Sequence, residues 1–149
     1  RLEDADHVGI IRKGNILYFA NELDEMYYHH GARLHRDLFL RGLELVHRHP
    51  MVQTTLPSTG RVSLLHQADE KRYVVHLLFA APSQRGNCEV IEDLVPLYEV
   101  PVRVDLPVQV QRATLIPAMQ ALALEKSADG VNVVVPVFSC HCAIAFDYE

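Results

Sequence analysis

The chain has 149 residues, three cysteines and a formal net charge of -5, from 14 basic and 19 acidic side chains. A chain of this length buries enough surface for one or two small domains without disulfides, and an acidic balance without a basic stripe argues against nucleic acid as a partner. No apolar run is long enough to span a bilayer, so we expect no membrane partner either. The odd cysteine count favours a reducing compartment, of which the cytoplasm is the expected one.

The first fifty residues predict a hairpin followed by one helix. Two β-rich runs, 7–13 and 15–20, flank Gly14, which suits a tight antiparallel turn. Residues 32–47 then follow a period of 3.6, with the apolar side chains in one half of the helical wheel and most charged ones in the other. Pro50 discourages the preceding residue from helical geometry and ends the helix.

After Pro50 the period changes from 3.6 to 2. Strand-like runs lie at 51–56, 61–67, 72–80, 97–106, 108–116, 119–125 and 131–138, and turn-forming segments separate them. Many short strands with no helix between them predict an antiparallel β-sandwich over 51–149. The fold class is therefore mainly β, with the sandwich preceded by a β-hairpin and one amphipathic helix from an incomplete α/β domain over 1–50.

Two strands carry finer predictions. In 97–106 the alternation places Tyr98, Val100 and Val104 on the inward face, and Pro101 predicts an edge strand because proline removes a ladder donor. The run from Tyr73 to Ala80 is apolar on both faces except for His76, which predicts a central strand.

Five histidines lie between Tyr27 and Pro50, but their spacing does not form a metal site. A helical zinc pair needs two imidazoles three or four residues apart, whereas His30 and His35 are five apart and His47 and His49 straddle the helix end. His35 falls within the apolar arc of the predicted helix. We expect its ring to be satisfied by a buried carbonyl or carboxylate.

The stretch from Cys140 to Cys142 also has a simpler interpretation than metal binding. Alternation along a strand turns Cys140 and Cys142 toward the core with Phe138, and turns His141 the other way. Free cysteine packs as a small apolar residue, so a converging Cys-His-Cys set is not expected. No metal ligands and no cofactor-binding residues are predicted.

Adjacent acids and aromatic rings are the remaining candidates for carbohydrate chemistry. Glu92 and Asp93 are neighbours in sequence, so in an extended chain they point apart and cannot face each other across a glycosidic bond. Sugar binding needs exposed ring faces, and with no tryptophan and with Tyr98 and Tyr73 expected inside, the sequence offers no aromatic platform. No catalytic residue is predicted.

A family resemblance adds information that periodicity does not give. The segments GNILYFANELDEMYYHHGARLHRDLFLRGLELV, RYVVHLL, QRGNCEVIEDLVPLYEVPVRV and DGVNVVVP, with the closing H-C-A-I-A-F strand, resemble the C-terminal region of a family of glycoside hydrolases related to the β-galactosidases. The resemblance implies that residues 1–50 are the tail of a glutamine-amidotransferase-like trimerisation domain and that 51–149 are the terminal β-sandwich. The catalytic carboxylates of that family belong to a barrel that this chain lacks, so none is carried over.

Together these observations predict a non-catalytic accessory fragment of a glycoside hydrolase that supports domain packing or oligomerisation. The alternatives are a carbohydrate-binding β-sandwich module and a hydrolase in its own right. The expected partners are other domains or subunits of the parent enzyme, or a second copy, and the helix could hide its apolar face by exchange, docking or dimer formation. The turn formed by Gln84, Arg85, Gly86 and Asn87 is the predicted interdomain contact, because an exposed turn on a rigid sandwich is well placed to meet a neighbour.

Overall fold

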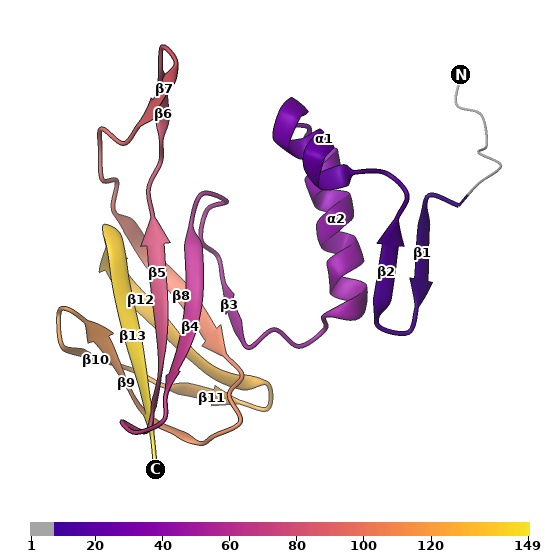
Figure 1. The fold of residues 1–149 in the computed structure, drawn as a ribbon. Helices are drawn as coiled ribbons and strands as arrows, with labels where there is room; N and C mark the ends of the chain where they lie inside the picture. Colours follow the sequence, from indigo (N-terminus) through magenta and orange to yellow (C-terminus); the bar gives the residue numbers. More distant parts are fainter. Residues whose placement is uncertain (1–7) are drawn as a thin grey trace. The chain divides into compact units, whose positions relative to one another are not determined.

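The computed structural model describes residues 8–149, which form two compact units, and the first ends in sequence at Pro50 and the second begins at Met51 (Figure 1). The first unit contains a two-stranded hairpin and two helices, and the second contains the strands that follow. Each unit is described by itself. Within the described residues, no helix is both long and apolar enough to cross a membrane.

The first unit opens with the antiparallel hairpin that the sequence predicts. Strands β1 (Ile10–Lys13) and β2 (Ile16–Phe19) pair from Ile10 opposite Phe19 to Lys13 opposite Ile16. Gly14 has a φ of 59°, a left-handed conformation that glycine adopts without strain, and this lets the chain reverse within two residues. The predicted first strand began at His7, which lies outside the described residues.

A short helix that the sequence analysis did not predict lies between the hairpin and the predicted helix. Helix α1 (Leu23–His30) buries Leu23, carries acidic residues in its first turn and ends with histidines, in agreement with the helix dipole. Gly31 terminates it in the left-handed conformation, and its backbone N–H donates to the Tyr27 carbonyl at 2.8 Å. Eight residues give little more than two turns, too few for the 3.6-residue period to be visible.

The predicted amphipathic helix is present as α2 (Arg33–Val46), one residue shorter at each end than expected. It packs on the hairpin through Gly42, because a Cβ at this position would lie 2.5 Å from Phe19 Cζ and 2.6 Å from Leu17 Cδ2. Glycine therefore allows the close approach of helix and strand.

Much of the apolar surface of the first unit remains exposed. On α2, the Leu34 side chain is 75% exposed and Leu38 and Leu45 are also exposed. On the hairpin, Leu17 and Phe19 face α2, whereas Ile16 and Tyr18 alternate to the opposite face and are 70% and 60% exposed. A hairpin that is apolar on both faces is typical of a sheet covered by layers on both sides. In the described residues of this unit, α2 covers one face of the hairpin.

The second unit is an antiparallel β-sandwich, which confirms the predicted fold class. One sheet has the order β10-β9-β13-β5-β4 and the other has the order β11-β12-β8-β3. The strands of the first sheet are β4 (Arg61–Gln67), β5 (Arg72–Phe79), β9 (Val110–Ile116), β10 (Gln120–Leu122) and β13 (Cys140–Tyr148). Those of the second are β3 (Val52–Thr54), β8 (Leu97–Val104), β11 (Glu125–Ser127) and β12 (Gly130–Phe138). As predicted from its apolar faces, β5 is a central strand.

Alternate side chains from both sheets fill the space between them. The largest fully buried side chains come from four strands, with Phe146 and Ile144 on β13, Val75 and Leu77 on β5, Val102 and Val104 on β8, and Val133 and Val135 on β12. Among residues 8–149, no polar or charged residue is buried. The core is therefore held by apolar burial.

Strand β8 differs from the prediction in two ways. It is not an edge strand, because β12 pairs with most of its length and β3 pairs with Val102, Arg103 and Val104 on its other side. Pro101 precedes the part that β3 covers, so its missing N–H does not interrupt that pairing.

The second difference concerns the faces of β8. Glu99 has a φ of 49°, which breaks the period of two, so Leu97 packs against the core and Tyr98 turns outward with 68% of its side chain exposed. The prediction that Tyr98 lies inside is therefore wrong, while Val100, Val102 and Val104 point inward as expected.

Candidate functional site

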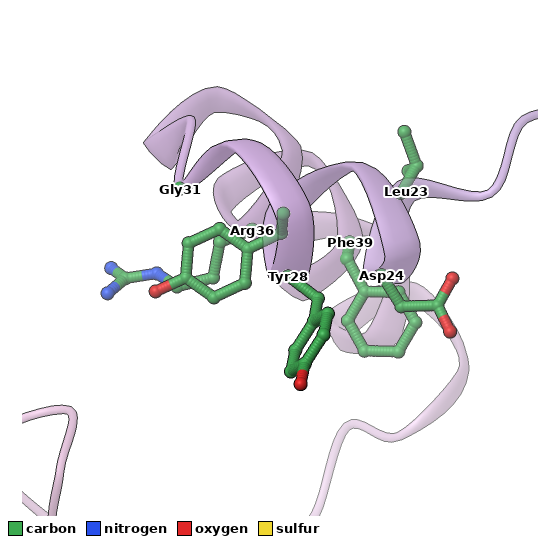
Figure 2. Close-up of a pocket in the computed structure, with 7 residues that line it drawn as sticks. Leu23, Asp24, Tyr28, Gly31, Arg36 and Phe39 are labelled. Carbon is green, nitrogen blue, oxygen red and sulfur yellow. The ribbon is translucent and has the colours of Figure 1, made fainter. Parts of the chain in front are cut away.

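A hollow lined by three aromatic side chains lies between the two helices of the first unit (Figure 2). Its volume is about 490 Å³, and it is lined by Leu23, Asp24, Tyr27, Tyr28, Gly31, Arg36 and Phe39. The left-handed turn at Gly31 reverses the chain and brings the start of α2 alongside α1. One carboxylate and one guanidinium line this hollow, and the guanidinium already donates to Asp37 Oδ1 at 3.2 Å. Because hydrolysis of a glycosidic bond uses two facing carboxylates, this lining does not form a hydrolytic pair.

A second group of titratable residues stands at the start of α1. Glu22 precedes the helix and lies three residues before Glu25, and the pKa of Glu25 is raised because its protonated carboxyl donates a hydrogen bond to Glu22 and because Glu22 carries a negative charge. His29 Nε2 lies 3.7 Å from Glu25 Oε1. This cluster is not among the residues predicted from the sequence, although Glu22, Glu25 and His29 follow one another at spacings of three and four residues. Both Glu25 and His29 are more than half exposed, as in a solvated helix surface.

The four histidines considered in the sequence do not meet in space as a ligand set. His30, His47 and His49 are exposed, and His35 is half-buried. The expected partner for His35 is not found, since its Nδ1 atom is buried without a hydrogen-bond partner within the described residues.

Cys140, His141 and Cys142 lie at the start of β13 and do not converge. Cys142 is buried as predicted, and burial raises the pKa of its thiol to about 11, so it stays neutral and unreactive near pH 7. Cys140, in contrast, is exposed, and the prediction that it faces the core is wrong. Its φ of 63° breaks the alternation at this position, so that the inward period begins at Cys142.

His141 instead meets a histidine from another strand. His76 Nδ1 lies 3.1 Å from His141 Nε2, and the two rings are stacked with an interplanar angle of 10°. Both project from the outer face of the five-stranded sheet, since their neighbours Leu77 and Cys142 point into the core. The two residues are 65 positions apart, and only the pairing of β5 with β13 brings them together.

The predicted contact segment forms the tip of a small hairpin. Strands β6 (Ser83–Arg85) and β7 (Cys88–Val90) pair from Ser83 opposite Val90 to Arg85 opposite Cys88, and the hairpin extends beyond the ends of β5 and β13 (Figure 1). The sequence predicts only a turn in this region, so the two short strands are a finding of the structure. Gln84 and Arg85 are in β6, while Gly86, with a φ of 59°, and Asn87 make the two-residue turn.

An ion pair ties this hairpin to the segment that follows it. Arg85 Nε donates to Glu92 Oε1 at 3.2 Å, and its Nη2 pairs with the other carboxylate oxygen, so the contact is bidentate. Gln84 Nε2 donates to the Gly86 carbonyl at 2.7 Å and supports the turn. The Glu92 carboxylate is therefore paired with the Arg85 guanidinium, and Asp93 beside it is exposed. Ile91 before this acidic pair and Leu94 and Val95 after it are exposed apolar side chains.

Comparison with solved structures provides one informative match. The chain is similar to the α-L-fucosidase isoenzyme 2 from Paenibacillus thiaminolyticus, with a TM-score of 0.87 and 35% sequence identity over 95% of this chain. It resembles part of a glycoside hydrolase. The matched region is 22% of the fucosidase chain, so the present chain spans about a fifth of that enzyme. No protein-family profile matches the chain, and no curated protein matches it.

This similarity supports the coarser part of the resemblance seen in the sequence. It supports a glycoside hydrolase region that contains a β-sandwich. It does not single out the β-galactosidases or identify a trimerisation domain.

Proposed function

We propose that this chain is a non-catalytic accessory region of a glycoside hydrolase, and that its two units supply packing surfaces for neighbouring domains or subunits. The observation that carries the proposal is the similarity to about a fifth of an α-L-fucosidase, 22% of that chain. By extension, α-L-fucosides are the substrate class we propose for the parent enzyme. The first fifty residues would be the tail of an amidotransferase-like trimerisation domain of the kind present in β-galactosidase relatives.

The exposed apolar surface of the first unit supports this role. Leu34, Leu38 and Leu45 lie on one flank of α2, and contiguous apolar surface of this kind usually marks an interaction site in a stable protein. The hairpin adds Ile16 and Tyr18 on the face away from the helix. A neighbouring layer of the parent enzyme would cover both.

The acidic residues support the non-catalytic part of the proposal. Glu22 and Glu25 stand on the exposed start of α1, and Glu92 is held by Arg85. A hydrolytic pair instead needs two carboxylates that face each other across a substrate.

The test of the packing role is a double substitution on α2 in the parent enzyme. We expect Leu38→Arg with Leu45→Arg to disrupt assembly and to reduce glycoside turnover with it, because two charges would be buried without partners in the interface. Light scattering gives the oligomeric state, and a chromogenic α-L-fucoside gives the turnover. Glu44→Ala on the exposed polar face is the matched control and should change neither. Unchanged assembly and activity in the double variant would contradict the packing role.

The projecting hairpin is the second proposed contact, and it has its own test. We expect Arg85→Ala in the parent enzyme to weaken domain docking by more than about 2 kcal/mol, because Arg85 anchors an interface. Loss of the exposed Arg85–Glu92 ion pair alone would cost about 1 kcal/mol of stability or less. Thermal unfolding of the parent measures the change, with Arg61→Ala on the same sandwich as the control. Docking by this hairpin is ruled out if Arg85→Ala leaves assembly, melting and activity as they were.

The alternative function is a carbohydrate-binding module. The position of Tyr98 favours it, although the sequence predicted this ring inside the sandwich. Tyr98 is exposed, so a ring face is available on the sandwich. Calorimetric titration of this chain with galactosides and fucosides separates the two functions. A packing region releases no binding heat, whereas saturable binding that Tyr98→Ala abolishes would establish the module.

A further inference from the structure

The stacked histidines on the outer face of the sandwich are the polar cluster that the proposed function leaves without a role. His76 is half-buried on β5 and His141 is exposed on β13, and each ring directs a nitrogen at the other across 3.1 Å. The register places Ala143 opposite His76 and Leu78 opposite His141, so the pair is diagonal across the two strands. Such neighbours are within reach of long side chains on one sheet face.

We propose that His76 Nδ1 and His141 Nε2 bind one divalent cation of the class that prefers imidazole nitrogen, namely Zn²⁺, Ni²⁺ or Cu²⁺. Two nitrogens bound to one tetrahedral zinc at about 2.0–2.1 Å are about 3.3 Å apart. The observed separation is 3.1 Å, close to this value, and both rings must turn so that their lone pairs meet at one cation instead of facing each other.

Binding changes the protonation of one ring in a defined way. The imidazole that donates the bridging N–H must carry its proton on the other ring nitrogen, and both lone pairs then face the cation. The hydrogen bond between the rings is replaced by two nitrogen-metal bonds, with no net loss of protons from the neutral pair.

The surroundings make this an open site that prefers softer cations. In the part of the chain that the structure describes, no third His, Cys, Asp or Glu completes a ligand group, so water fills the remaining positions. Ser63 lies opposite His76 on β4, but neutral oxygen and imidazole do not suit Mg²⁺ or Ca²⁺. Arg61 lies opposite Leu78 and is exposed, and salt screens its charge.

A bound cation would join β5 to β13 and stabilise the sandwich. The two histidines are 65 residues apart, so the unfolded chain does not hold them as a pair. A cation that binds the folded state preferentially raises the temperature of unfolding.

The test titrates the full chain, free of any affinity tag, with ZnCl₂ and NiCl₂ in a calorimeter. We expect one saturable site, which His76→Gln or His141→Gln weakens by about tenfold or more because each removes half of the protein ligands. His49→Gln, an exposed histidine outside the pair, is the matched control and should bind as the original chain does. Circular dichroism of each variant shows that the fold is retained.

A second readout is the unfolding temperature in the presence of ZnCl₂. It should rise in the original chain and in His49→Gln, and it should not change when both His76 and His141 are replaced. Undiminished zinc binding in that double variant, no saturable binding by the original chain, or equal binding of MgCl₂ would each overturn the site. Because the experiment uses this chain alone and no sugar, its failure leaves the proposed packing function untouched.

Discussion

Phe146→Ala is expected to lower the free energy of unfolding of the sandwich by about 3–5 kcal/mol. Phe146 is 0% exposed and lies on β13 between two other central strands, so the truncated side chain leaves a cavity that neighbouring strands cannot close. A loss of this size is a large fraction of the total stability of a small domain. Urea unfolding followed by circular dichroism in the β-sheet region measures it.

Two companion variants make the result specific to core packing. Tyr98→Ala removes an exposed ring and should change the unfolding free energy by less than about 0.5 kcal/mol. Phe146→Leu keeps most of the volume and should cost less than about 2 kcal/mol, a clear recovery relative to alanine. Equal stability of Phe146→Ala and Tyr98→Ala would contradict the assignment of Phe146 to the sandwich core.

Gly130→Ala is expected to destabilise the sandwich by about 3 kcal/mol, through backbone strain and a steric clash together. Gly130 begins β12 with a φ of 127°, a backbone conformation that residues other than glycine rarely adopt. A Cβ there would overlap the Val104 carbonyl oxygen and lie 3.0 Å from its carbon. Because both atoms belong to the backbone of β8, they can move only if the strand pairing shifts.

Gly86→Ala separates the two causes of that loss. Gly86 also has a positive φ, of 59°, but a Cβ there would meet no atom within 4 Å. We therefore expect a cost of only about 1 kcal/mol from backbone strain, measured by the same urea unfolding. If the two alanine variants lose the same stability, the clash with Val104 is not the reason for glycine at position 130.

Strands β6 and β7 are not predicted from the sequence, and the single run predicted at 119–125 divides into β10 and the start of β11. The long strands are predicted because their signal is local, and the apolar runs of β5 and β12 locate both strands to within one residue. Helix α2 was found for the same reason, since its fourteen residues span several turns. Helix α1 was missed because eight residues do not repeat the pattern often enough.

The direction of single side chains was less predictable. Tyr98 and Cys140 were both assigned to the inward face by alternation, and both are exposed because Glu99 and Cys140 adopt positive φ values. Neither residue is a glycine, so the sequence gives no sign that the backbone leaves the extended region there. Both corrections matter for function, because one aromatic ring and one thiol lie on the surface and not in the core.

Composition and period determined that this protein has a sandwich with an apolar interior and a helix with one apolar face, because both follow from spacing along the chain. The tertiary structure decided which distant residues meet: His76 with His141, and Gly130 with the Val104 carbonyl. These contacts depend on strand order and register, which are set by the packing of the whole sheet. In the first unit, the packing of α2 on the hairpin leaves Leu34, Leu38 and Leu45 uncovered.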